Sequence, residues 1–247
     1  MGVPAAGRLA REIEHHRGIA AQAEAVWNWE SPAGRRRADR RAALYVRHAP
    51  LAPGVRALEL GCGTGVFLEK VAPTGASIQG LDLTAELLAR ARVRLARFPK
   101  VRIDCGNAEE LPYRDGAFDA VYGSSVLHHV RLEPTLREAF RVLRPGGRVV
   151  FTEPNALNPQ VAFMFHFEPT KRYFGVSQDE MAFSRFRARS ALVGTGFEDV
   201  HVAPFDFLHP SIPARWIAAS EGICARLEHV PVVREVAGSL LIRAVRP

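Results

Sequence analysis

The chain has 247 residues, of which 47% are apolar and 24% charged, and its formal net charge is +7. This length suits one well-buried α/β domain and is too short for two domains of comfortable size unless one is small. No run approaches the roughly 18 consecutive apolar residues of a membrane span, so we expect no integral membrane segment. Three cysteines, Cys62, Cys105 and Cys224, form no metal-type spacing and leave an odd count, which favours a reducing cytoplasm.

The excess of positive charge is partly local. Five arginines lie within seven residues, at positions 35, 36, 37, 40 and 41. Such a cluster either keeps an exposed helix in water or contacts an anionic substrate or partner. A second set, at positions 90, 92, 94 and 97, alternates with the apolar residues of an expected helix and is interpreted as its solvated face.

The first fifty residues have helical spacing. Apolar residues recur at intervals of three and four between residues 9 and 29, and Ser31-Pro32 is a typical helix start that predicts a second helix over 34–48. Trp27 and Trp29 are two positions apart and cannot share one helical face, so one is expected in the core and the other in a cleft or lid. We therefore predict that residues 1–53 form a helical cap in front of a core at 54–247.

From residue 55 the pattern alternates between strand and helix. Strands are predicted at 55–60, 76–81, 101–104, 118–122 and 147–152, and helices at about 65–72, 84–97 and 133–143. The alternation predicts a parallel sheet with helices on both faces. Ligands of such sheets bind at the carboxyl ends of the strands, near the point where the strand order reverses.

A glycine-rich loop follows the first strand, with Gly61, Gly63 and Gly65 at alternating positions. Glycines there can adopt positive φ and let a ligand lie against the backbone. Asp82 ends the second strand and is placed to accept hydrogen bonds from a ribose. The loop departs from the dinucleotide pattern because Val66 replaces the third glycine, and Glu59 is unfavourable beside a pyrophosphate. These residues favour a nucleoside ligand that carries positive charge.

Five segments in order carry a family resemblance. Residues 58–65, Leu-Glu-Leu-Gly-Cys-Gly-Thr-Gly, resemble motif I of the class I S-adenosylmethionine-dependent methyltransferases, of the small-molecule, type 11-like kind. Residues 106–113, 118–122, 125–130 and 143–148 are similar to the later motifs of that family. The resemblance covers roughly residues 55 to 152. It implies a Rossmann-like three-layer α/β sandwich whose seven-stranded sheet is mostly parallel, with the last strand, at about 238–245, inserted antiparallel between the fifth and sixth.

The same resemblance implies the cofactor, S-adenosyl-L-methionine, and the residues around it. These are Glu59, Gly61, Cys62, Gly63, Asp82, Leu83, Asn107, Ala108 and Ser124. The sulfonium supplies the electrophile, so the protein mainly positions the acceptor, excludes water and, for an oxygen acceptor, removes a proton.

His128 and His129 follow the fourth strand, where the methyl group is expected to point. They are the candidate catalytic residues, and we expect at most one of them to face the cleft. Either one acts as a general base, or the pair only shapes the wall around the cofactor. No metal is expected, because no His, Asp or Glu cluster has metal-type spacing. The Asn-Pro-Pro-aromatic and Pro-Cys motifs of DNA methyltransferases are missing, so no nucleic-acid substrate is expected.

The region after the fifth strand is predicted to be an acceptor-side insertion at about 154–186. Glu153, Asn155, Phe163 and Phe167 are the candidate substrate-binding residues there, together with Trp27 and Trp29 of the cap. The aromatic residues either form a lid over an acceptor pocket or a small core beneath the insertion. Helices are predicted to start at Ser177 and to cover 187–193 and 216–227, with a sixth strand at 200–206.

We therefore expect an enzyme that methylates a small organic acceptor such as a natural product, quinone or lipid-like molecule, with O-methylation favoured and a homodimer an open option. Three alternatives stay open: C- or N-methylation of a small, phosphorylated molecule, a non-catalytic cofactor-binding protein, and an NAD(P)-dependent oxidoreductase. The sequence does not identify the acceptor.

Overall fold

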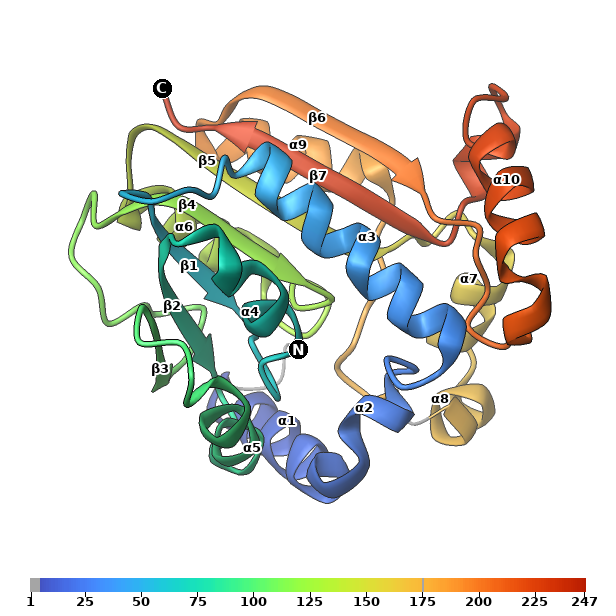
Figure 1. Cartoon of the computed structure of the whole chain (residues 1–247), viewed down its shortest axis with the longest axis horizontal. Coiled ribbons are helices and arrows are strands. Elements are labelled where there is room, and N and C mark those ends of the chain that lie inside the picture. The colour runs from blue at the N-terminus through green and yellow to red at the C-terminus, as the bar shows by residue number, and fades with distance from the viewer. Residues whose placement is uncertain (1–4, 175) are drawn as a thin grey trace.

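A single twisted sheet of seven strands organises the chain (Figure 1). The computed structural model describes residues 5–174 and 176–247. The strands are β1 (Arg56–Leu60), β2 (Ser77–Asp82), β3 (Val101–Cys105), β4 (Phe118–Ser124), β5 (Leu143–Pro154), β6 (Glu198–Phe205) and β7 (Ser239–Val245). Their order is β3-β2-β1-β4-β5-β7-β6, with β7 antiparallel to both of its neighbours. This confirms the predicted Rossmann-like sheet, and it places the reversal of strand order between β1 and β4.

Two layers of helices cover the sheet. Helices α3 (Pro32–His48), α4 (Val66–Val71) and α5 (Ala85–Leu95) pack on one face, and α6 (Leu132–Val142) and α9 (Arg185–Thr195) on the other. The central strands β1, β4 and β5 are covered on both faces, and their buried apolar residues are divided between two separate cores. The edge strand β3 differs, because its residues 102, 104 and 105 are exposed.

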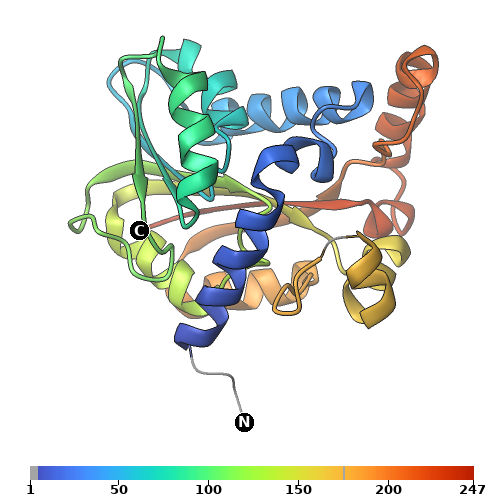
Figure 2. The same ribbon diagram turned by 90° about the horizontal axis from the view of Figure 1, so that it is seen from below.

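The N-terminal segment does not form the single helix expected over residues 9–29. It contains α1 (Ala5–Ile19), a 3-10 turn at Ala20–Gln22 and the short α2 (Ala23–Val26). Figure 2 shows α1 passing across the carboxyl ends of the strands from one helical layer towards the other. Glu24 on α2 accepts hydrogen bonds from Arg90 and Arg94 on α5. Two arginines that were predicted to be solvated therefore hold α2 in place.

The chain leaves the core layers again after β5. Helices α7 (Pro159–His166), α8 (Glu168–Phe174) and α10 (Ile217–Leu227), with 3-10 turns at Ala214–Trp216 and Val233–Val236, lie beyond the ends of β5 and β6 (Figure 1). The prediction of a helix that starts at Ser177 is wrong. Ser177 donates its backbone N–H to Glu180, as a helix start would, but its hydroxyl is turned to the distant Glu12 and caps no backbone N–H of the described residues. No helix within the described ranges is long and apolar enough to span a bilayer.

Candidate active site

The glycine loop connects β1 to α4. Gly61, Gly63 and Gly65 have φ of 66°, 50° and 81°, in the left-handed region that glycine tolerates best. The backbone N–H of Gly63 donates to Oδ2 of Asp82 at 2.8 Å, and Oδ1 accepts from the N–H of Thr84 at 2.9 Å. Burial raises the pKa of Asp82, and these two backbone donors act in the opposite direction. The loop thus fixes the carboxylate at the tip of β2.

A cavity of about 650 Å³ extends from this loop beneath the N-terminal helices. Its volume is within the range of small-molecule and cofactor sites. Of the nine residues expected around the cofactor, eight line it: Gly61, Cys62, Gly63, Asp82, Leu83, Asn107, Ala108 and Ser124. Gly63 lines the cavity beneath the Trp27 ring, and Asp82 retains lone pairs for a ribose. These residues fit S-adenosylmethionine.

Glu59 is the exception, because it does not line the cavity. Its side chain lies inside the sheet layer and is 1% exposed. The Tyr122 hydroxyl lies beside it, yet neither group has a hydrogen bond of ordinary geometry to the described residues. Burial raises the pKa of Glu59 to about 8. Because it lies outside the cavity lining, this carboxyl group does not contact the space that a cofactor would occupy.

Both tryptophans line the cavity, contrary to the expectation that only one would. Helix α2 ends before Trp27, and Asn28 has a φ of 61°, so the helical geometry that would separate the two rings no longer applies. The Trp27 ring lies over the glycine loop, where a Cβ added to Gly63 would be 3.2 Å from it. Trp29 packs edge-to-face on Phe67, with ring centroids 5.4 Å apart.

The two histidines lie at the other end of the cavity and both line it. His128 is 7% exposed, and its Nδ1 is 2.8 Å from Oε2 of Glu153. Oε1 of Glu153 accepts the backbone N–H groups of Val126 and Leu127, at 2.9 Å each. Because this fully buried carboxylate is held by two fixed donors, it orients the His128 ring and favours the tautomer with the proton on Nδ1. Nε2 of His128 is then a proton acceptor.

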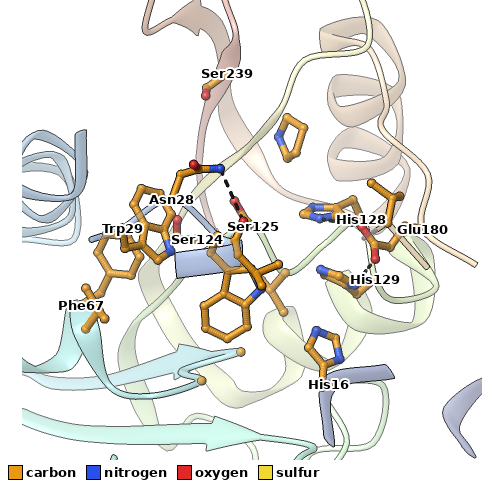
Figure 3. Close-up of a pocket in the computed structure, with 18 of the residues that line it drawn as sticks. His16, Asn28, Trp29, Phe67, Ser124, Ser125, His128, His129, Glu180 and Ser239 are labelled. Atoms are coloured by element: carbon orange, nitrogen blue, oxygen red, sulfur yellow. Dashed lines mark hydrogen bonds and ion pairs between the residues drawn. The ribbon is translucent and has the colours of Figure 1, made fainter. Parts of the chain in front are cut away.

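His129 is surrounded by carboxylates. Its Nδ1 lies 3.2 Å from Oε2 of Glu12 on α1 and 3.6 Å from Oε1 of Glu180. Burial would lower the pKa of His129, but Glu180, Glu12 and Glu153 outweigh burial and raise it to about 9. His16 on α1 lies beside it, and burial lowers the pKa of His16 to about 4. Figure 3 shows His128, His129 and Glu180 gathered at one side of the cavity with His16 beside them, and Trp29 and Phe67 on the opposite side.

Four residues predicted to bind substrate do not line the cavity. Glu153 contacts His128 on the side away from the cavity. The amide of Asn155 donates to the backbone carbonyls of residues 235 and 237 at 2.8 Å. Phe163 and Phe167 point to solvent, with ring centroids 5.0 Å apart. The cavity side of α7 is formed by Val161, Met164 and Phe165 instead, because helical spacing turns Phe163 to the opposite face. Phe165 packs edge-to-face on His128.

Most arginines of the cluster form ion pairs with carboxylates from the last fifty residues of the chain. Arg36 and Arg40 bind Glu221 and Glu228 on the α10 side, and Arg37 binds Asp206. Arg41 is 3% exposed and reaches the cavity wall, where it donates to Ser124 at 3.0 Å and to Ser239 at 2.8 Å. Only Arg37 and Arg41 of the described cluster line the cavity.

Several residues of the site were not anticipated from the sequence. Glu12, His16 and Glu180 converge on the histidines from segments far apart in the chain, and Ser239 comes from the last strand. One local signal was present, since Glu12 and His16 are four residues apart and therefore share a helical face.

Comparison with known proteins supports the part of the site that the glycine loop and Asp82 form. Residues 58–151 match the family model described as a methyltransferase domain. A probable S-adenosylmethionine-dependent methyltransferase of Mycolicibacterium smegmatis is 36% identical over 46% of this chain and 44% of its own length. A demethylmenaquinone methyltransferase of Tropheryma whipplei is 39% identical over 40% of this chain and 42% of its own length. The chain thus spans less than half the length of these curated relatives.

A solved structure extends the likeness to the whole fold. It is a methyltransferase of Thermotoga maritima, described as a possible histamine N-methyltransferase, and it is 20% identical with a TM-score of 0.64 over 94% of this chain and all of its own. The fold, the glycine loop and the cavity resemble those of class I S-adenosylmethionine-dependent methyltransferases. Residues 58–151 match the methyltransferase domain family, and the cofactor that this match supports is S-adenosylmethionine.

Proposed function

We propose that this protein transfers the methyl group of S-adenosylmethionine to an oxygen atom of a small organic acceptor. The observation that carries the proposal is the continuity of one cavity between the glycine loop and the His128–Glu153 pair. The loop end suits the cofactor, and the histidine end suits an acceptor hydroxyl whose proton must be removed. N- and C-methylation need no such group in every case, so the buried pair favours oxygen.

The proton acceptor in this proposal is Nε2 of His128. Glu153 holds the proton of Nδ1, as the carboxylate of a catalytic triad does, and so leaves Nε2 free to act as a base. His129 is less suited, because a pKa of about 9 keeps it charged near neutral pH. His129 would instead pair with Glu12 and so hold α1 across the cavity.

The acceptor proposed is an apolar, ring-containing molecule of the quinone or lipid-like kind. Phe165, which packs edge-to-face on His128, gives the histidine end of the cavity an aromatic wall. The curated relatives named as demethylmenaquinone methyltransferases support a quinone-like acceptor, but they do not support oxygen as the methylated atom. Arg41 and Arg37 would admit an anionic group at the wall formed by Ser124 and Ser239, although Asp206 balances one of their two charges.

The test has a binding part and a turnover part. Calorimetry is expected to show binding of S-adenosylmethionine and no comparable binding of NADH, and tight NADH binding alone would contradict the proposal. Release of S-adenosylhomocysteine is then measured with a panel of hydroxylated quinols and phenols. Failure of every acceptor to release it above background would favour the non-catalytic alternative.

With an accepted substrate, His128→Ala is expected to lower kcat by about 10²- to 10⁴-fold, the usual contribution of a general base. The dissociation constant for S-adenosylmethionine should change little, because His128 lies at the acceptor end. The matched control is His201→Ala, since His201 is exposed on β6 outside the cavity. Full turnover by His128→Ala would exclude His128 as the base.

A further inference from the structure

Three side chains at the histidine end of the cavity converge on one point. Nε2 of His128 lies 3.7 Å from Oε2 of Glu180, and Nδ1 of His129 lies 3.6 Å from Oε1 of the same carboxylate. One ligand atom from each residue falls within 4.8 Å of the other two. We propose that His128, His129 and Glu180 bind one divalent transition-metal ion inside the cavity.

The distances favour co-ligands over hydrogen-bonded partners. A contact of 3.6 or 3.7 Å between nitrogen and oxygen is too long for an ordinary hydrogen bond. Two ligand atoms that each lie about 2.1 Å from a shared ion at a tetrahedral angle are about 3.4 Å apart. The two histidines approach different oxygens of Glu180, so the carboxylate would bind the ion through both oxygens. His129 would give up its contact with Glu12 and the proton on Nδ1 in order to become a ligand.

The outer contacts of His128 are those of a metal ligand. A ligating histidine usually donates its other ring N–H to a carboxylate, which fixes the tautomer and directs the free nitrogen at the ion. Nδ1 of His128 makes this contact with Glu153 at 2.8 Å, and two backbone N–H groups hold Glu153 in turn. The lone pair of Nε2 is thereby kept on the side of Glu180.

The buried carboxylates around the proposed ion site also favour a bound cation. Glu12, Glu153 and Glu180 are 2%, 0% and 5% exposed, and every ion pair that they make within the described part of the chain is to a histidine. The nearby cations have other partners, since Arg8 pairs with Glu109 and Lys171 donates to two backbone carbonyls. Buried carboxylates need compensating charge, and a divalent ion supplies it.

Two imidazole nitrogens with one carboxylate select the borderline first-row metals, such as Zn²⁺, Fe²⁺, Co²⁺ or Mn²⁺, over Mg²⁺ and Ca²⁺. The remaining coordination positions face the cavity and would take an oxygen of the acceptor. This role rests on the proposed methyl transfer, although binding of the ion does not. His128 would then be a ligand and not the base: an ion lowers the pKa of a bound hydroxyl, which would lose its proton to water in the cavity. Spacing along the sequence did not indicate this site, because Glu180 is 51 residues from His129.

The test uses the full chain stripped of metal with a chelator and titrated with Co²⁺ as the probe. Calorimetry is expected to give one ion per chain, with visible absorption bands of Co²⁺ bound to nitrogen and oxygen. Glu180→Gln and His128→Ala should each weaken binding at least tenfold, and Glu153→Gln by about 10- to 100-fold, because Glu153 orients the ring of His128. His201→Ala is the matched control and should bind as the parent does.

Two readouts keep the result interpretable. Circular dichroism and S-adenosylmethionine affinity show whether each variant is folded, and His129→Gln replaces Glu180→Gln if that variant is not. Lack of stoichiometric Co²⁺ binding, or unchanged binding by folded Glu180→Gln and His128→Ala, would overturn the site. Methyl transfer that persists in excess chelator would overturn the role of the ion in the reaction, but not the site itself, and would leave His128 as the base. A protein that binds Co²⁺ but not S-adenosylmethionine would instead contradict the proposed function.

Discussion

Glu59 carries its carboxyl group in a place that water does not reach. In the unfolded chain such a group ionises near pH 4.5, whereas in the folded protein burial raises its pKa to about 8. Between these two values the folded state holds a proton that the unfolded chain has lost. Stability must therefore fall as the pH rises through this window.

Glu59→Gln provides the test of this linkage, because it keeps the shape of the side chain and removes its titration. The parent should lose stability as the pH rises from about 5 to 8, by at most about 1.4 kcal/mol per pH unit from this group. The variant should lack that contribution, so the difference between the two proteins should grow with pH. Urea unfolding at several pH values measures it, and parallel curves for parent and variant would show that Glu59 is not buried as described.

His128 and His129 are neighbours in sequence with different surroundings. The ring of His128 is set by one buried carboxylate, Glu153, whereas His129 is shared between Glu12 and Glu180. A pattern of two adjacent histidines does not reveal this difference, because the carboxylates come from α1, β5 and the segment before α9. The sequence predicted the pair as candidates but did not predict what orients them.

At the scale of elements, the turn from β1 into α4 is the most tightly constrained part of the site. Gly61 has positive φ, and a Cβ placed there would lie 2.6 Å from Cγ2 of Val126. Both the backbone conformation and the close approach of the segment after β4 therefore require glycine. The loop can support the cofactor only because it packs against the chain that carries the histidines.

Gly61→Ala is therefore expected to destabilise the protein by about 1–3 kcal/mol or more and to weaken S-adenosylmethionine binding, since left-handed strain and a steric clash combine. Gly54→Ala is a matched control, because Gly54 also has positive φ but has no atom within 4 Å of the added Cβ. Thermal unfolding and calorimetry compare the two variants. Equal losses in both would mean that the contact with Val126 is unimportant.

The core elements follow from the sequence and several peripheral ones do not. Strands β1 to β4 and helix α3 match their predicted positions to within two residues, because apolar runs, glycine turns and the Ser31 cap are local signals. The break between α1 and α2 and the irregular segment at Ser177 depend on long-range contacts. Ser177 and Glu12 are hydrogen-bonded but lie 165 residues apart, and no local pattern encodes such a pair.

The candidate site divides in the same way. The residues that line its cofactor end follow from the sequence, because the glycine loop comes directly after β1 and Asp82 is the last residue of β2. The acceptor end was predicted less well: Phe165 and Glu180 line it, whereas Phe163 and Phe167 do not. The helical phase of α7 and the packing of α1 over the cavity decide which side chains face inward, and neither is visible in the residue pattern.

At the scale of the whole molecule, the last strand completes both the sheet and the site. Strand β7 fills the gap between β5 and β6, and Ser239 at its start accepts a hydrogen bond from Arg41 at the cavity wall. A chain that ends at Gly238 leaves β5 and β6 without the strand that joins them.

Such a truncated chain is expected to bind S-adenosylmethionine at least tenfold more weakly than the parent, and to be cleaved by trypsin much faster, because two strand edges lose their hydrogen bonds. A chain that lacks only Pro247 is the control and should behave as the parent does. Limited proteolysis and calorimetry check the result, and normal cofactor affinity in the shorter chain would show that β7 is dispensable for the site.

The position of β7 has a consequence for biosynthesis. The ribosome makes β6 at residues 198–205 and delivers its partner only after a further 33 residues, at Ser239. During that interval β6 has no neighbour in the sheet, and Arg41 lacks one of the hydroxyl groups that bind it in the finished wall. The cofactor pocket is therefore completed late in translation, so an incompletely synthesised chain should bind S-adenosylmethionine more weakly than the finished protein.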